Sequence, residues 1–168
     1  MMPEGSLSGQ LWLYRATTFP TAWVRDRVLI DRPLIDASLV EFGGAWWLFG
    51  TDHTRPRAAK NGELEAWHAA SPLGPWEQHG LNPLIASDRG GSARSGGRPL
   101  VHEGRLYRFA QDCTQTYGHK VAAAGGARAG LGGTSHLLLL LLLPAGWIDA
   151  WPFLPSRAAA GGLGGHQA

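Results

Sequence analysis

The chain has 168 residues, enough for one ordinary domain, and its 24 glycines, 11 prolines and 17% charged residues indicate a turn-rich protein. Lysine and arginine exceed aspartate and glutamate by 15 to 13, and this net charge of +2 is too small and too scattered for a nucleic-acid-binding surface. A single cysteine, Cys113, excludes an internal disulfide.

The first thirty residues predict a leader and two strands. Residues 1–10 have no basic segment followed by an apolar core, so no signal peptide is expected and we interpret them as a disordered leader. Residues 11–16 (LWLYRA) predict a strand that ends in a Thr-Thr-Phe-Pro turn. Residues 23–30 alternate between two faces and predict a second strand, which Pro33 and its neighbours terminate.

A strong hairpin signal follows at residues 36–52, DASLVEFGGAWWLFGTD. Two β-rich runs separated by Gly-Gly predict a two-residue turn, because both glycines can adopt a positive φ. This turn sets the pairs Val40–Trp47, Leu39–Leu48 and Ser38–Phe49. Both faces then carry bulky apolar side chains, so we expect the hairpin to lie between two layers.

A similar sequence that predicts a second hairpin occurs sixty residues later, at residues 96–112, and aligns with residues 36–52 without a gap. Residues 64–70 (LEAWHAA) and 76–79 predict a third and a fourth strand between the two copies, although Glu and Ala would also allow a short helix over 64–70. The identities between the copies are Gly44 with Gly104, Phe49 with Phe109, and Asp52 with Asp112. Four short antiparallel strands per repeated unit are typical of a propeller blade.

Residues 122–168 differ in composition from the rest of the chain. They contain one acidic residue, Asp149, among Ala/Gly runs and the seven leucines of 137–143. Seven residues span about 10 Å as a helix, far less than the hydrocarbon core of about 30 Å, so no membrane span is expected. We interpret 122–168 as a low-complexity tail, non-native or disordered, without a packed partner.

Over residues 11–121 the chain resembles the N-terminal domain of the glucosamine inositolphosphorylceramide transferases, plant and algal glycosphingolipid enzymes. The motifs that support the resemblance are PLID at 33–36, WWLFGTDH at 46–53, NGELEAW at 61–67, SPLGPW at 71–76, ARSGGR at 93–98 and QDC at 111–113. The Leu-Gly-Pro-Trp turn also occurs in arabinanase- and invertase-type five-bladed propellers. The resemblance therefore implies an all-β fold over 11–121, a partial five-bladed β-propeller of about two blades. It also implies a Golgi protein whose full-length form has further blades and a transferase domain.

Hairpin and propeller geometry select the candidate site residues. In a propeller the first strand of each blade lines the central axis, so Asp36, Arg94 and Arg98 are expected to face one axial pocket. The residues expected near its rim are Asp52, His53 and Asp112. Guanidinium and carboxylate groups beside aromatic rings suit sugar hydroxyls or a phosphate, so these six residues are the candidate substrate-binding residues.

Structural roles compete with each of these assignments. Asp52 and Asp112 at strand ends can cap turns, and Asp36 can serve either as a general base or as a hydrogen-bonding group within the blade. Arg98 can pair with an acidic neighbour instead of a ligand. The residues read as packing groups are Trp46, Trp47, Trp67 and Trp76. The seven histidines show no ligand spacing, so neither a metal site nor a cofactor is expected.

Three functions stay open from the sequence. The first is a propeller module that handles a carbohydrate or an inositolphosphorylceramide headgroup, as part of a glycosyltransferase-type protein; whether this chain is itself an enzyme stays open. The second is a glycoside hydrolase of the arabinanase or invertase type with Asp36 as a catalytic carboxylate. It is disfavoured, because such enzymes need two acids at a defined separation and the next blade has Gly96 at the matching position. The third is a truncated structural module without activity.

Overall fold

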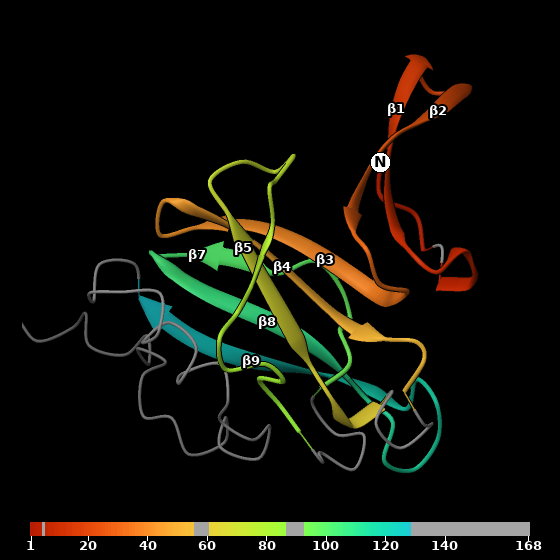
Figure 1. Ribbon diagram of the computed structural model, residues 1–168. Helices are drawn as coiled ribbons and strands as arrows, with labels where there is room; N and C mark the ends of the chain where they lie inside the picture. Colours follow the sequence, from red (N-terminus) through yellow and green to blue (C-terminus); the bar gives the residue numbers. More distant parts are fainter. Residues whose placement is uncertain (5, 56–60, 87–92, 129–168) are drawn as a thin grey trace, which may run out of the picture.

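The computed structural model describes residues 1–4, 6–55, 61–86 and 93–128, and in these ranges the regular secondary structure is almost wholly antiparallel strand (Figure 1). The first sheet is a hairpin of β1 (Leu11–Thr18) and β2 (Ala22–Ile30). The second sheet has the order β3 (Leu34–Phe42), β4 (Ala45–Asp52), β5 (Glu65–Ala69) and β6 (Glu77–Gln78). The third sheet has the order β7 (Leu100–His102), β8 (Arg105–Asp112) and β9 (Lys120–Arg128).

The β3–β4 hairpin has the register that the sequence predicts. Its turn residues Gly43 and Gly44 have φ values of 63° and 79°, which L-residues with a side chain adopt only at a cost. The pairs Val40–Trp47, Leu39–Leu48 and Ser38–Phe49 are all formed. The pairing is interrupted between Ile35 and Ser38, where β3 contains one more residue than β4 and forms a bulge.

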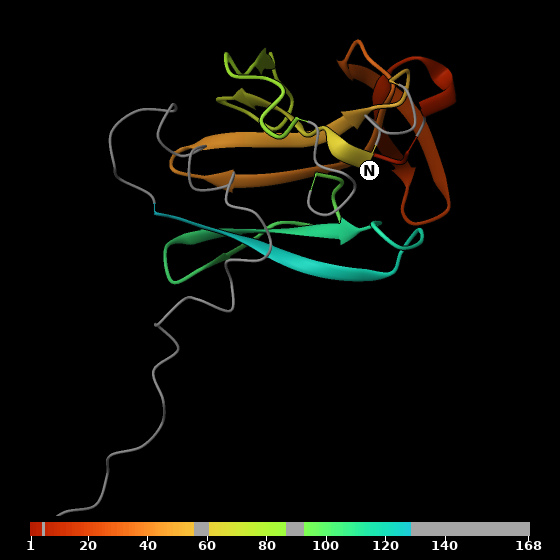
Figure 2. The ribbon, with the colours of Figure 1, turned by 90° about the horizontal axis from the view of Figure 1, so that it is seen from below.

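The second and third sheets lie face to face as two layers, with the β1–β2 hairpin beside them (Figure 2). One face of the β3–β4 hairpin packs into a core that reaches the third sheet and contains Val40, Phe42, Trp47, Phe49, Leu64, Ala66, Leu84, Ala93 and Leu106. The other face contributes to a second core with the first sheet, formed by Leu11, Leu29, Ile30, Leu34, Leu48 and Trp67. Apolar residues on both faces therefore place the hairpin between two layers, as predicted.

A short segment before β7 continues the third sheet beside the end of β8. The Gly96 N–H donates to the carbonyl oxygen of Phe109 at 2.9 Å, and the Gln111 N–H donates to that of Arg94 at 2.9 Å. A Cβ atom on Gly96 would lie 2.9 Å from the carbonyl carbon of Ala110, closer than real contacts allow. The two backbones can approach this closely only because residue 96 is a glycine.

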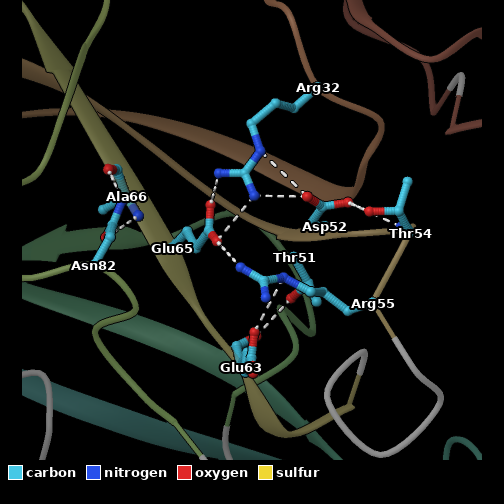
Figure 3. A network of polar contacts seen from close by, with 9 residues as sticks. All are labelled: Arg32, Thr51, Asp52, Thr54, Arg55, Glu63, Glu65, Ala66 and Asn82. Atoms are coloured by element: carbon cyan, nitrogen blue, oxygen red, sulfur yellow. Dashed lines mark hydrogen bonds and ion pairs between the residues drawn. The ribbon is translucent and has the colours of Figure 1, made fainter.

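A charged network ties the segment before β3 to the ends of β4 and β5 (Figure 3). The Arg32 guanidinium donates to Asp52 Oδ2 and to Glu65 Oε2, each at 2.6 Å. Both carboxylates are buried, with side-chain exposures of 8% for Asp52 and 3% for Glu65. Burial alone would lower the pKa of Arg32, but the hydrogen bond to Asp52 and the charge of Glu65 outweigh it and raise the pKa above its ordinary value.

Some element boundaries differ from those predicted. The segment 64–70 forms strand β5 and no helix, and the fourth strand is shorter than predicted. The expected disordered leader contains a 3₁₀ turn at Ser6–Ser8, and its Met1 amino group donates to the carbonyl oxygen of Tyr14 at 2.6 Å, so backbone hydrogen bonds to β1 fix it.

The third sheet also extends past the predicted boundary at residue 121. Strand β9 runs to Arg128 because it pairs with β8 along its length. Residues 129–168, including the leucine run at 137–143, lie outside the described residues. Among the residues that the structure describes, no helix has the length and apolar character needed to cross a bilayer.

Candidate functional site

A cleft of about 570 Å³ lies along β3, the edge strand of the second sheet. It extends from the N-terminal segment at Met2 to the segment that precedes β7. Its polar and glycine lining residues are Asp36, Ser38, Ser95, Gly96, Gly97, Arg98 and Gln111, and its apolar ones are Met2, Ala37, Leu39 and Trp46. This mixture of polar and apolar lining residues suits an amphipathic ring such as a sugar or a polyol.

Asp36 lies in the bulge of β3 and takes a left-handed conformation, with a φ of 50°. This conformation is uncommon for a residue other than glycine, and aspartate tolerates it better than most. The carboxylate accepts a hydrogen bond from Arg94 Nε and a second, at 3.3 Å, from Gln111 Nε2. Gln111 Nε2 also donates to the carbonyl oxygen of Ser95 at 2.8 Å. The bulge thus directs the Asp36 side chain toward the third sheet and ties the two sheets together at the cleft.

The Arg94 guanidinium forms an ion pair with Asp36. Burial alone would lower the pKa of its guanidinium, but the hydrogen bond and the charge of Asp36 outweigh burial and raise the pKa above its ordinary value. Because Arg94 neutralises Asp36, the pair contributes no net charge to the cleft. Arg94 therefore positions Asp36 and is not itself a lining residue.

Arg98 supplies the uncompensated charge of the cleft. Its side chain is exposed, and among the described residues no carboxylate lies within ion-pair distance of it. The hydroxyl groups of two other lining residues, Ser38 and Ser95, are buried and have no hydrogen-bond partner within the described part of the chain. Unsatisfied buried hydroxyls carry an energetic cost, which a polar ligand in the cleft can reduce.

Asp52 and Asp112 both cap the turn that follows their strand. Asp52 Oδ1 accepts hydrogen bonds from the N–H and the hydroxyl of Thr54, at 2.8 and 2.7 Å. Asp112 Oδ1 accepts the same pair from Thr114, at 3.0 and 2.6 Å. This explains why aspartate recurs at the same position of both units, since each carboxylate fixes the chain reversal that follows.

The capping hydrogen bonds also shift the acidity of both carboxyls. Those from Thr114, assisted by Lys120, lower the pKa of Asp112 to about 2 from 3.8. Burial alone would raise the pKa of Asp52, but hydrogen bonds from Thr54 and Arg32 outweigh it and lower that pKa.

Of the six residues predicted from the sequence, the structure brings Asp36, Arg94 and Arg98 together at one cleft. Asp36 and Arg98 line it and Arg94 contacts Asp36 from behind the lining, whereas Asp52, His53 and Asp112 are not among the lining residues. The His53 backbone N–H donates to the carbonyl oxygen of Pro33 at 2.8 Å. The expectation that these three residues lie near the rim assumed a regular hairpin, whereas the bulge turns Asp36 away from Asp52, which pairs with Arg32 instead.

Sequence reasoning missed three polar lining residues, Ser38, Ser95 and Gln111. Of these three, only Gln111 could have been identified from the sequence, because the predicted second hairpin places it beside residues 96–98. Trp46, read as a packing residue, is half-buried and lines the cleft, whereas Trp47 and Trp67 are buried in the two cores. Within the described ranges, no three His, Cys, Asp or Glu side chains are grouped so as to hold a metal ion.

Comparison with known protein sequences places the chain beside one family. The family described as Glucosamine inositolphosphorylceramide transferase 1, N-terminal, matches residues 1–124. Over 121 residues the chain is 56% identical to Glucosamine inositolphosphorylceramide transferase 1 of Oryza sativa subsp. japonica and 46% identical to that of Arabidopsis thaliana. Each match covers 72% of this chain and 16% of the relative, so the chain spans about one sixth of the length of these relatives.

Comparison with solved structures gives a likeness of fold. The exo-beta-1,3-galactanase of Phanerochaete chrysosporium superposes with a TM-score of 0.52 at 13% sequence identity, over 71% of this chain and 27% of that protein. At this identity the likeness concerns the fold alone. It confirms the predicted class, an all-β arrangement of antiparallel sheets of the propeller type.

Proposed function

The chain belongs to the glucosamine inositolphosphorylceramide transferase family, and we propose that its cleft binds the headgroup of a glycolipid, either a carbohydrate or an inositol phosphate. The names of the relatives describe a transfer to inositolphosphorylceramide by proteins much longer than this chain. In this proposal the described region contributes binding to that reaction, and the bond-forming chemistry belongs to other parts of the full-length protein. Its location in the Golgi stays a prediction from the family resemblance.

The observation that supports this proposal most is that one cleft contains both Arg98 and hydrogen-bonding side chains that their neighbours hold in place. An exposed guanidinium without a carboxylate partner favours an anionic group such as a phosphodiester. Asp36 and Gln111 are held in place by neighbouring residues and can exchange hydrogen bonds with hydroxyl groups. Trp46 adds an aromatic ring to the lining of the cleft. An inositol phosphate has the anion, the hydroxyl groups and the carbon ring that these groups fit.

Glycoside hydrolysis fits the cleft less well. Hydrolysis with two acids requires carboxyl groups about 5–10 Å apart, one on each side of the bond that is cleaved. Asp36 is the one carboxylate among the described residues that line the cleft, and Arg94 and Gln111 already occupy it. The likeness to a galactanase concerns the fold and supplies no second acid.

Calorimetric titration of the protein with myo-inositol 1-phosphate and with myo-inositol tests the proposal. We expect the phosphate to bind more tightly, and we expect Arg98→Gln to weaken its binding about tenfold, because a charge-assisted hydrogen bond is lost. Arg105→Gln, at the other end of β8, is the matched control and should leave binding unchanged. Absence of binding, or equal affinity of the Arg98→Gln variant and the wild type, would contradict the proposal.

A further inference from the structure

The turn between β8 and β9 presents an exposed aromatic ring close to the cleft. The His119 N–H donates to the carbonyl oxygen of Thr116 at 3.2 Å, which closes a four-residue turn. Gly118, the third residue of this turn, has a φ of 69°, as a type II turn requires. Tyr117 occupies the corner and is 67% exposed. A large aromatic side chain held outward on a defined turn is a candidate for contact with another molecule.

Tyr117 is also fixed from the inside. The Cζ atom of Arg94 lies 5.0 Å from the centroid of the Tyr117 ring, within the range of a cation–π contact. The same guanidinium holds the Asp36 carboxylate, which lines the cleft. Ring, guanidinium and carboxylate therefore form a continuous row from the surface to the cleft. Figures 1 and 2 show the β8–β9 turn at the end of the molecule where β3 begins.

In this arrangement the Tyr117 ring has a fixed position before any ligand packs on it. An aromatic ring that already has a fixed position loses little conformational entropy when a ligand packs on it. The C–H groups of a pyranose form an apolar patch that suits an aromatic face, while the sugar hydroxyls keep their contact with water. A ligand anchored in the cleft at Arg98 and Asp36 would extend toward the surface past Arg94 and reach Tyr117.

We propose that Tyr117 forms a second subsite, on which a sugar ring stacks while the anionic part of the same ligand occupies the cleft. This inference rests on the proposed function and narrows its ligand class to an inositol phosphate that carries a further pyranose. Arg94 has two roles in it, because it positions Asp36 with its charge and supports the Tyr117 ring with its guanidinium face.

The test compares two probes, myo-inositol 1-phosphate and the same compound carrying one glucosamine on the inositol, by calorimetry with the full chain. We expect the glycosylated probe to bind wild type about fivefold to tenfold more tightly than the plain one, which is the size of an added aromatic contact. Tyr117→Ala should remove this gain and leave the plain probe unaffected, whereas Tyr117→Phe should keep it. Phe19→Ala, which removes a 78% exposed ring on the β1–β2 turn, is the matched control.

The other outcomes separate this inference from the proposed function. If the wild type binds both probes equally, or if the gain survives Tyr117→Ala, the second subsite is wrong and the cleft proposal stands. Equal weakening of both probes by Tyr117→Ala would show that the ring only covers the Arg94–Asp36 ion pair, and would also overturn the subsite. If the wild type binds neither probe, both proposals fail.

Discussion

The conformation of Asp36 is the single-residue feature on which the geometry of the cleft depends. Its φ of 50° costs on the order of 1 kcal/mol, and the contacts with Arg94 and Gln111 offset this cost. We expect Asp36→Ala to lower the free energy of unfolding by about 1–3 kcal/mol, because alanine keeps the backbone strain and leaves Arg94 half-buried without its partner. Asp36→Gly should cost less, since glycine removes the strain.

Urea unfolding of the two variants measures this difference. Glu103 is the matched control, because it has a φ of 49° and an exposed side chain. Glu103→Ala and Glu103→Gly report the backbone effect without a buried partner. If Asp36→Ala were no more costly than Glu103→Ala, the ion pair with Arg94 would not stabilise the fold.

The pKa of Asp112 tests the capping role of the repeated aspartates. Its carboxyl has a pKa of about 2 in the folded protein against 3.8 ordinarily, mainly through hydrogen bonds from Thr114. A lowered folded-state pKa means that the carboxylate stabilises the fold above about pH 4, and that this contribution is lost as the pH falls through about 2. Thr114→Val should raise the pKa toward 3.8, and Thr54→Val should not. A carboxyl-carbon NMR titration of Asp112 measures the midpoint; an unshifted value in the wild type would refute the cap.

Among the elements, the short segment at residues 94–96 places Arg94 and Ser95 beside β8, and it depends on Gly96. We expect Gly96→Ala to lower the free energy of unfolding by about 1–3 kcal/mol, because the added methyl group meets the backbone at Ala110. Gly80→Ala is the control, since a Cβ atom there has no heavy atom within 4 Å. Thermal melts of both variants compare them directly. An equal effect of the two substitutions would show that the close approach at residue 96 is not maintained in solution.

In the charged network at the ends of β4 and β5, we expect Arg32 to contribute much more to the stability of the fold than Arg55. Arg32→Met should destabilise the fold by about 2–3 kcal/mol, because it removes the guanidinium that lies 2.6 Å from two buried carboxylates, and Arg55 at 3.7 Å from Glu65 compensates only weakly. We place the value below that of a fully buried pair because the Arg32 side chain is 29% exposed. Arg55 is 43% exposed and lies 3.6 Å from Glu63 and 3.7 Å from Glu65, so Arg55→Met should cost less than about 1 kcal/mol.

Chemical denaturation of the two variants measures both values. A cost for Arg55→Met as large as that for Arg32→Met would mean that the network acts as one unit. The assignment of most of the stabilisation to Arg32 would then be wrong.

Some strands could be predicted from the sequence and others could not. The β3–β4 register was predictable because Gly43-Gly44 fixes the turn and bulky residues on both faces exclude a shift by one residue. Strand β9 was not predictable, since six of its nine residues, KVAAAGGAR, are Ala or Gly, which are depleted in strands. It forms a strand because β8 offers it a free edge, which is a tertiary effect. The bulge at Asp36 also has no local signal, because aspartate there could equally end a regular strand.

The whole described molecule consists of two stacked sheets with the β1–β2 hairpin beside them (Figure 2). The cleft lies between the edge strand β3 and the segment that precedes β7. The meeting of Asp36, Arg94 and Arg98 could be predicted because propeller geometry brings the starts of the inner strands together. The different placement of Asp52 and Asp112 could not, since it depends on the bulge and on local threonine caps. The repeated residues thus serve the architecture, and the residues that differ between the two units form the cleft.

The most direct test of the cleft as the binding site is a ¹H–¹⁵N NMR titration of the protein with myo-inositol 1-phosphate. We predict that the largest shift changes occur at the Arg98 side-chain Nε–H, the Gln111 side-chain amide, the Trp46 indole N–H and the backbone amides of residues 95–98. The indole N–H of Trp23, on the β1–β2 hairpin, should stay unchanged. Absence of any shift change, or changes that centre on the β1–β2 hairpin and leave Arg98 unaffected, would contradict the proposed site.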